Sequence, residues 1–101
     1  MYLIHILLPV ADNQGKPFPD NLLQDIQSEL VERFGGLTAH TRSPAAGIWK
    51  RNGAKQKDDI VIIEIMAGSL DAEWWRQFRQ SLEKRLEQEE IIIRAQETRK
   101  I

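Results

Sequence analysis

The segment that decides the fold is Ile60–Ala67, IVIIEIMA, in which bulky apolar side chains surround one carboxylate, that of Glu64. Valine and isoleucine favour extended backbone, because their branched side chains pack well on a pleated surface. A run this apolar that ends at Gly68 is typical of a strand with neighbours on both sides. We therefore predict a central strand here, and Glu64 is its one residue that packing does not explain.

The composition is that of one globular domain spanning residues 1–101, with 29% charged and 42% hydrophobic residues. A net charge of -1 gives no basic field for nucleic acid or anionic lipid, so neither nucleic acid nor a membrane is expected as a partner. The absence of cysteine excludes thiolate metal sites and cysteine nucleophiles. The apolar start, MYLIHILLPV, has no basic leader and is too short to span a bilayer. We expect a cytoplasmic protein without a cofactor.

Strands and helices alternate in the remaining sequence. Strand composition is found in Tyr2–Leu8, Leu37–Arg42, Ile60–Ala67 and Glu90–Ala95. The first helix is expected to start at a cap formed by Asp20 and to end at Gly35-Gly36, and the second to be capped by Ser69 or Asp71. An irregular arm, residues 43–58 and the turn pair Asn52-Gly53 within it, is predicted as a loop in which Ile48 and Trp49 could form a short hairpin.

An internal repeat supports this order of elements. Sliding the first helix by 52 positions (82 minus 30) pairs Leu30 with Leu82, Ile26 with Phe78, and the other members of the two apolar stripes with each other. Each helix is preceded and followed by an apolar strand, so the chain reads as strand-helix-strand twice. This pattern predicts an α+β ferredoxin-like sandwich, βαββαβ, with a four-stranded antiparallel sheet and two helices on one face.

Alternation along each strand divides the sheet into two faces. The face expected under the helices is almost wholly apolar: Tyr2, Ile4, Ile6, Leu8, Leu37, Ala39, Thr41, Val61, Ile63, Ile65, Ala67, Ile91, Ile93 and Ala95. The other, which we call the open face, is mixed: Leu3, His5, Leu7, Thr38, His40, Arg42, Ile60, Ile62, Glu64, Met66, Ile92, Arg94 and Gln96.

The apolar members of the open face form a patch that soluble monomers seldom expose. Burying such side chains is worth about 1.5–3 kcal/mol each, which favours a cover. We expect a homodimer, with two sheets packed face to face. The alternative cover is the chain's own arm around Ile48 and Trp49.

The polar members of the open face form the candidate site. In the strand order of a ferredoxin-like sheet they fall in the row Arg94, His5, Glu64 and His40, with Arg42 beside His40. One interpretation is a buried ion-pair network that sets the register of a dimer. Another is a ligand-binding or catalytic cluster, because perturbed charges gather at such sites. A third is a metal site of two histidines and a carboxylate, for which the sequence shows no local geometry.

In the ligand-binding hypothesis each residue has a role. Arg42 and Arg94 would hold an anionic group, Glu64 would orient a histidine or accept a proton, and Trp49 would wall the pocket between sheet and arm. The ligand-binding set is therefore His5, His40, Arg42, Trp49, Glu64 and Arg94.

Nucleotide chemistry is not indicated. An RNA-recognition sheet stacks bases on aromatic residues, whereas the open face carries His5, Ile62 and Glu64 at the corresponding positions. A phosphate loop opens a helix, whereas Gly35-Gly36 follows one.

A set of motifs extends along nearly the whole chain: Phe34-Gly35-Gly36 with Thr38, Gly47 with Trp49, Glu64, Trp75, Gln88-Glu89-Glu90 and Arg94. In this combination the chain resembles a family of small uncharacterised bacterial proteins. At the level of fold it is similar to the dimeric α+β barrel proteins, which include cofactor-independent monooxygenases, isomerases and stress-response proteins. The resemblance implies such an enzyme as a further alternative, by fold analogy alone.

Overall fold

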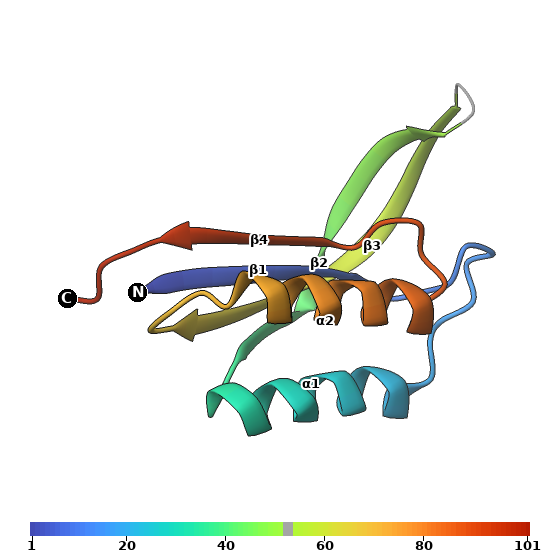
Figure 1. Cartoon of the computed structure of the whole chain (residues 1–101). Helices are drawn as coiled ribbons and strands as arrows, with labels where there is room; N and C mark the ends of the chain where they lie inside the picture. Colours follow the sequence, from blue (N-terminus) through green and yellow to red (C-terminus); the bar gives the residue numbers. More distant parts are fainter. Residues whose placement is uncertain (52–53) are drawn as a thin grey trace.

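The computed structural model describes the backbone of residues 1–51 and 54–101 and the side chains of residues 1–40 and 60–101. Its elements, in chain order, are β1 (Tyr2–Pro9), α1 (Asp20–Phe34), β2 (Thr38–Arg51), β3 (Ala54–Ala67), α2 (Ala72–Arg85) and β4 (Ile92–Glu97) (Figure 1). Neither helix in the described part of the chain has the length and apolar character needed to cross a membrane.

The four strands form one antiparallel sheet in the order β2-β3-β1-β4. Both helices lie on the same side of this sheet (Figure 1). The βαββαβ order with β1 and β3 in the centre is the predicted ferredoxin-like α+β sandwich, and the prediction is confirmed.

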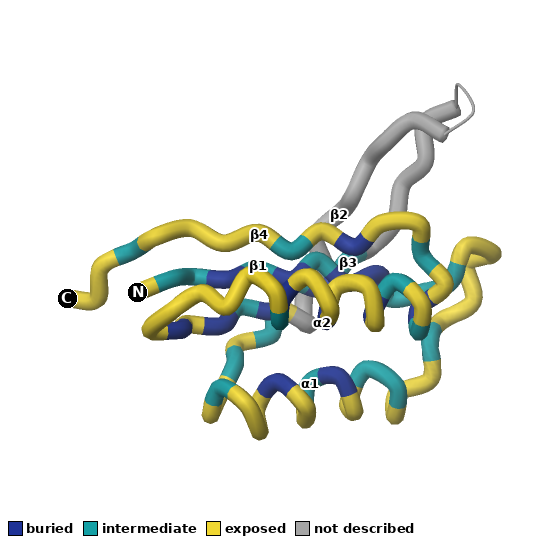
Figure 2. The backbone as a smooth tube through the Cα atoms, viewed as in Figure 1, coloured by how far each residue is buried: buried dark blue, intermediate teal, exposed yellow. Residues whose placement is uncertain are grey.

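The core lies between the helices and the sheet face that was predicted to be apolar. On β1 and β3 the buried residues alternate with half-buried ones, as Ile4, Ile6, Ile63 and Ile65 show with exposures of 0–1%. Buried residues also line the sides of both helices that face the sheet (Figure 2). The side chain of Thr41 lies outside the described residues. The side chain of Arg42 lies outside them as well, and Ala95, predicted for the core face, is exposed. For β1 and for residues 60–67 of β3 the predicted division into two faces is confirmed.

The first helix starts differently from the prediction. Its N-cap is Pro19, and Asp20 is the first helical residue, with no side-chain hydrogen bond that caps the helix. The carbonyl of Pro19 accepts from the backbone N–H of Leu22 at 3.1 Å, so the chain enters the helix one residue before the predicted cap. The predicted end is confirmed, because Gly35 has φ +83° and its N–H donates to the carbonyl of Val31 at 2.7 Å.

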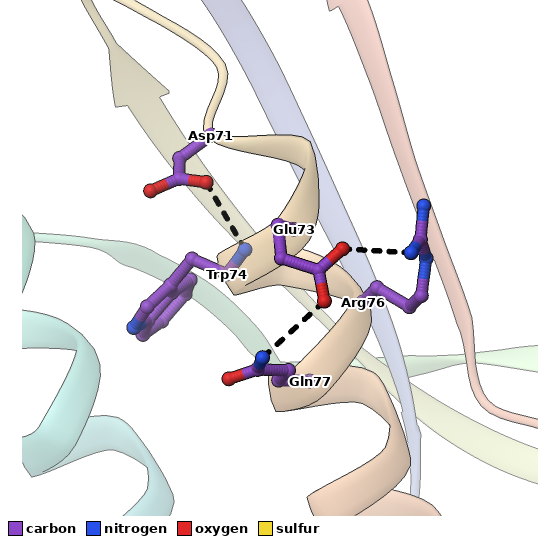
Figure 3. Close-up of polar contacts among 5 residues, drawn as sticks. All are labelled: Asp71, Glu73, Trp74, Arg76 and Gln77. Atoms are coloured by element: carbon purple, nitrogen blue, oxygen red, sulfur yellow. Dashed lines mark hydrogen bonds and ion pairs between the residues drawn. The ribbon is translucent and has the colours of Figure 1, made fainter.

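The second helix starts at the predicted cap. The Asp71 carboxylate accepts from the backbone N–H of Trp74 at 3.1 Å, and in the same turn Glu73 accepts from Arg76 and Gln77 (Figure 3). Asp71 therefore supplies a partner for one of the N–H groups that the first turn of a helix leaves free.

Replacing Asp71 by alanine is expected to lower the free energy of unfolding by about 1 kcal/mol, because the Trp74 N–H loses its acceptor. Urea unfolding would measure this loss. The matched control is Asp20→Ala on the first helix, where no side-chain cap exists and the loss should be clearly smaller. Equal losses at the two positions would contradict the role given to Asp71.

The arm differs most from the prediction, because it is strand rather than loop. β2 and β3 continue as paired strands from Ala45↔Ile60 to Arg51↔Ala54, with a register shift between His40 and Ala45. Pro44 lies within this shift and has no backbone N–H to donate to the neighbouring strand. The irregularity at this position allows β2 and β3 to pair both before and after it. Asn52-Gly53 lies outside the described residues. The predicted hairpin around it is confirmed by the pairing of its flanking residues, with longer strands than expected.

The last strand begins two residues later than predicted. Before the ladder starts, the backbone N–H of Ile91 donates to the Glu83 carboxylate of α2 at 2.9 Å. The first pair with β1 is then Leu7↔Ile92. This hydrogen bond to α2 holds Ile91 outside the sheet, so the strand starts later than its composition predicts.

Candidate functional site

The candidate site is built on the open face by residues of all four strands. In the backbone register His5 of β1 stands opposite Glu64 of β3 and opposite Arg94 of β4. His40 of β2 stands opposite Ile62, one diagonal step from Glu64, which itself pairs with Thr38. The backbone thus has Arg94, His5, Glu64 and His40 in the order that the sequence predicted.

Both histidines contact the same oxygen of Glu64. The distance from His5 Nε2 to Glu64 Oε1 is 3.1 Å, and that from His40 Nε2 to the same Oε1 is 3.3 Å. We call these three side chains the His-Glu-His cluster. Their exposed fractions are 17% for His5, 34% for Glu64 and 52% for His40, so the cluster is half-buried at β1 and open toward β2.

The hydrogen bonds keep Glu64 ionised. The bond from His5 lowers the pKa of the carboxyl below its ordinary value of 4.5, and the bond from His40 and the charges of both histidines act in the same direction. Partial burial opposes them by raising the pKa. Because a carboxylate only accepts, each histidine donates from Nε2 and, when neutral, leaves Nδ1 as an acceptor. In the described part of the chain, the second oxygen, Oε2, accepts no hydrogen bond.

Arg94 is next to the cluster but separate from it. It is exposed on the edge strand β4, opposite His5, and makes no hydrogen bond or ion pair with the side chains that the structure describes. The sequence placed it at the end of the row beside His5, and in the structure its guanidinium has no partner among the described side chains.

Arg42 and Trp49 lie outside the residues whose side chains are described. Both belong to β2, where Trp49 pairs with Gln56. Their predicted part in the site stays a prediction.

The surroundings of the cluster are apolar. Leu3, Leu7, Ile60 and Ile62 are half-buried. Met66 and Ile92 are 49% and 50% exposed. The cluster therefore stands in a surface that favours an apolar cover or ligand.

The described residues hold no group of three or more His, Cys, Asp or Glu side chains arranged to bind a metal ion. In the His-Glu-His cluster both nitrogens lie at hydrogen-bond distance from one oxygen, so the three groups satisfy one another instead of surrounding a common point.

A hollow that sequence reasoning missed lies on the helix side of the sheet. It has a volume of about 250 Å³ and is lined by residues of β1, α2, β4 and the turn before α2. None of the predicted site residues lines it. The small residues Ala72 and Ala95 are the sequence feature that could have indicated the hollow. The sequence around each of them does not show that the two side chains line the same space.

The fold and its open face define an α+β protein of ferredoxin-like architecture. A phage SAM lyase solved in complex with S-methyl-5'-thioadenosine is similar, with a TM-score of 0.64 and 17% identity over 95% of this chain and 80% of that one. The apo form of a phage SAM lyase has a TM-score of 0.58 at 18% identity, over 94% of this chain and 78% of that one. The divalent cation tolerance protein Cut A1 from Thermus thermophilus has a TM-score of 0.63 at 12% identity, over 99% of this chain and 86% of that one.

These identities support a shared fold and nothing finer. No protein family and no curated protein matches the sequence. The resemblance to a family of small bacterial proteins therefore stays a prediction, while the ferredoxin-like fold that it implied is confirmed.

Proposed function

We propose that this protein binds a small molecule with an anionic group on the open face of its sheet. The observation that carries the proposal is that the two carboxylate oxygens of Glu64 differ in their contacts. One carboxylate oxygen accepts from two histidines, which fix the side chain, and the other has no partner among the described residues. A positioned, ionised acceptor on an apolar surface is what ligand recognition requires.

The ligand would bridge β1, β3 and β4. Its anionic group would be held by Arg94, which has no other partner among the described side chains and can bind a carboxylate or phosphate with two parallel hydrogen bonds. A hydroxyl or amino group would donate to Glu64 Oε2, and an apolar part would cover Leu3, Leu7 and Ile62. His40, Arg42 and Trp49 would bound the site on the β2 side.

The similar phage enzyme suggests the first probes. S-methyl-5'-thioadenosine and SAM share hydroxyl and amino donors, but SAM also carries a carboxylate. Isothermal titration with both compounds should show binding of each. Arg94→Gln should weaken the binding of SAM about tenfold and leave the binding of S-methyl-5'-thioadenosine unchanged. The reason is that only SAM has an anionic group for the guanidinium to bind.

Arg99→Gln, a second exposed arginine outside the row, is the matched control and should change neither affinity. If Arg94→Gln weakened both compounds equally, Arg94 would not hold the anionic group. If neither compound bound at millimolar concentration, ligands of this class would be excluded.

A second candidate function rests on the exposed apolar side chains Met66 and Ile92. They favour an interaction protein in which two copies pack open face to open face and the His-Glu-His cluster lies in the seam. Sedimentation velocity over a range of concentrations separates the two candidates. A dimer that persists at micromolar concentration and rejects both probes would favour the seam.

A further inference from the structure

The hollow on the helix side of the sheet is distinct from the candidate site and lies on the opposite face. On the side of the sheet it is lined by Ile4 of β1 and by Ile93 and Ala95 of β4. On the side of the helix it is lined by Trp75 of α2. Ala72 at the start of α2 also lines it. Two of its lining side chains, those of Ala72 and Ala95, are single methyl groups, which leave space beside the larger Ile4, Trp75 and Ile93.

Two arginines of α2 line the same hollow. Arg76 and Arg79 lie one turn apart on the helix, and both line the hollow together with residues of β4. The Arg76 side chain extends from α2 toward β4 (Figure 3). The start of α2 adds the positive end of a helix dipole to these two charges.

The existing partners of these arginines are weak competitors. Arg76 Nη1 is 2.7 Å from Glu73 Oε2, but the two side chains are 58% and 60% exposed, and such pairs contribute little. Arg79 Nε is 3.9 Å from Glu83 Oε2, an oxygen that already accepts from the N–H of Ile91. Both guanidinium groups can therefore turn to a stronger anion at the hollow.

We propose that this hollow binds a small amphipathic anion, an alkyl or aryl carboxylate whose apolar body fills the space against Ile4, Trp75 and Ile93 while Arg76 and Arg79 hold its carboxylate. The volume of about 250 Å³ is below the range of drug-sized pockets, so the occupant is a short-chain acid or a single ring. Charge complementarity selects the acid over the corresponding alcohol.

Titration of the whole isotope-labelled chain with hexanoate, octanoate and hexan-1-ol, followed by amide NMR shifts, tests the proposal. We expect the shifts to be centred on the start of α2 and on β4. Each added methylene should tighten binding about fourfold until the hollow is full. Hexan-1-ol should bind about tenfold more weakly than hexanoate.

Variants separate the hollow from nonspecific binding. Ala95→Leu fills the space and should abolish octanoate binding with the fold intact, whereas Gln96→Leu, on the same strand but the other face, should preserve it. The Arg76→Gln, Arg79→Gln double variant should lose about tenfold in affinity. Glu73→Gln should gain affinity, because it removes the carboxylate that competes for Arg76.

Should Ala95→Leu unfold the protein, Ala72→Leu closes the hollow from the helix side and replaces it in the test. Octanoate binding that both filling variants leave unchanged would overturn the proposal, as would affinity without dependence on chain length. Arg94→Gln should leave octanoate binding unchanged, so failure of the open-face proposal and failure of this one are distinguishable.

Discussion

Replacing Ile63 by alanine is expected to lower the free energy of unfolding by about 2–5 kcal/mol, because removing this fully buried side chain of β3 would leave a cavity in the core. A loss of this size is a large part of the stability of a small domain. Urea unfolding followed by tryptophan fluorescence would measure it, since Trp75 belongs to the same core.

Ile62→Ala is the matched control, one residue away on the open face. The side chain of Ile62 is only half-buried, so its loss should cost clearly less than that of Ile63 if the chain is a monomer. If two copies cover the open face, the cost of Ile62→Ala should instead depend on protein concentration, because the variant weakens the dimer. Equal, concentration-independent losses at both positions would contradict the division of the sheet into a core face and an open face.

The contrast between Ile63 and Ile62 shows why the fold could be predicted from the sequence. Side chains on a strand alternate with a fixed period, so the apolar series on Tyr2–Pro9 and on residues 60–67 can be assigned to faces without any knowledge of tertiary contacts. The repeat between the two helices then leaves few topologies, and the ferredoxin-like order is among the commonest for such a pattern. The row Arg94, His5, Glu64 follows from that order once the register aligns the three residues, as it does in the structure.

The features that the sequence did not predict depend on contacts between distant segments. The arm forms strands because β2 and β3 support each other, although Pro44 and Gly47 favour a loop when read locally. The late start of β4 depends on a hydrogen bond between Ile91 and Glu83 of α2. The hollow depends on two alanines far apart in the chain.

The charge state of the His-Glu-His cluster sets the conditions in which it can act. Since the pKa of Glu64 is lowered from 4.5, the folded state favours the ionised carboxylate. Its contribution to stability is therefore complete above about pH 4.5 and is lost as the pH falls through the lowered pKa of the folded state. Across neutral pH, a ligand meets Glu64 as an anion and an acceptor.

Glu64→Gln is expected to weaken the binding of SAM or S-methyl-5'-thioadenosine by about tenfold to hundredfold, since the charged acceptor Oε2 is replaced by an amide NH2 group, which donates and cannot accept from the ligand. Glutamine keeps one oxygen that can accept from His5 and His40, so the side chain can stay in place and the loss reports on the missing second acceptor and its charge. Isothermal titration at pH 7 would measure the ratio of the affinities of wild type and variant, with Glu64 ionised. The ratio should shrink as the pH falls through the lowered pKa of Glu64, because the protonated carboxyl has lost its charge.

Glu97→Gln on β4 removes another exposed carboxylate of the same sheet and is the control for net charge. It should leave both affinities within about twofold of wild type, because it removes no contact of the proposed ligand and a single exposed charge is largely screened. A Glu64→Gln variant that binds as tightly as wild type would show that the second oxygen of Glu64 takes no part in recognition. The His-Glu-His cluster would then be a structural element of the sheet, and the case for an interaction surface at Met66 and Ile92 would be the stronger one.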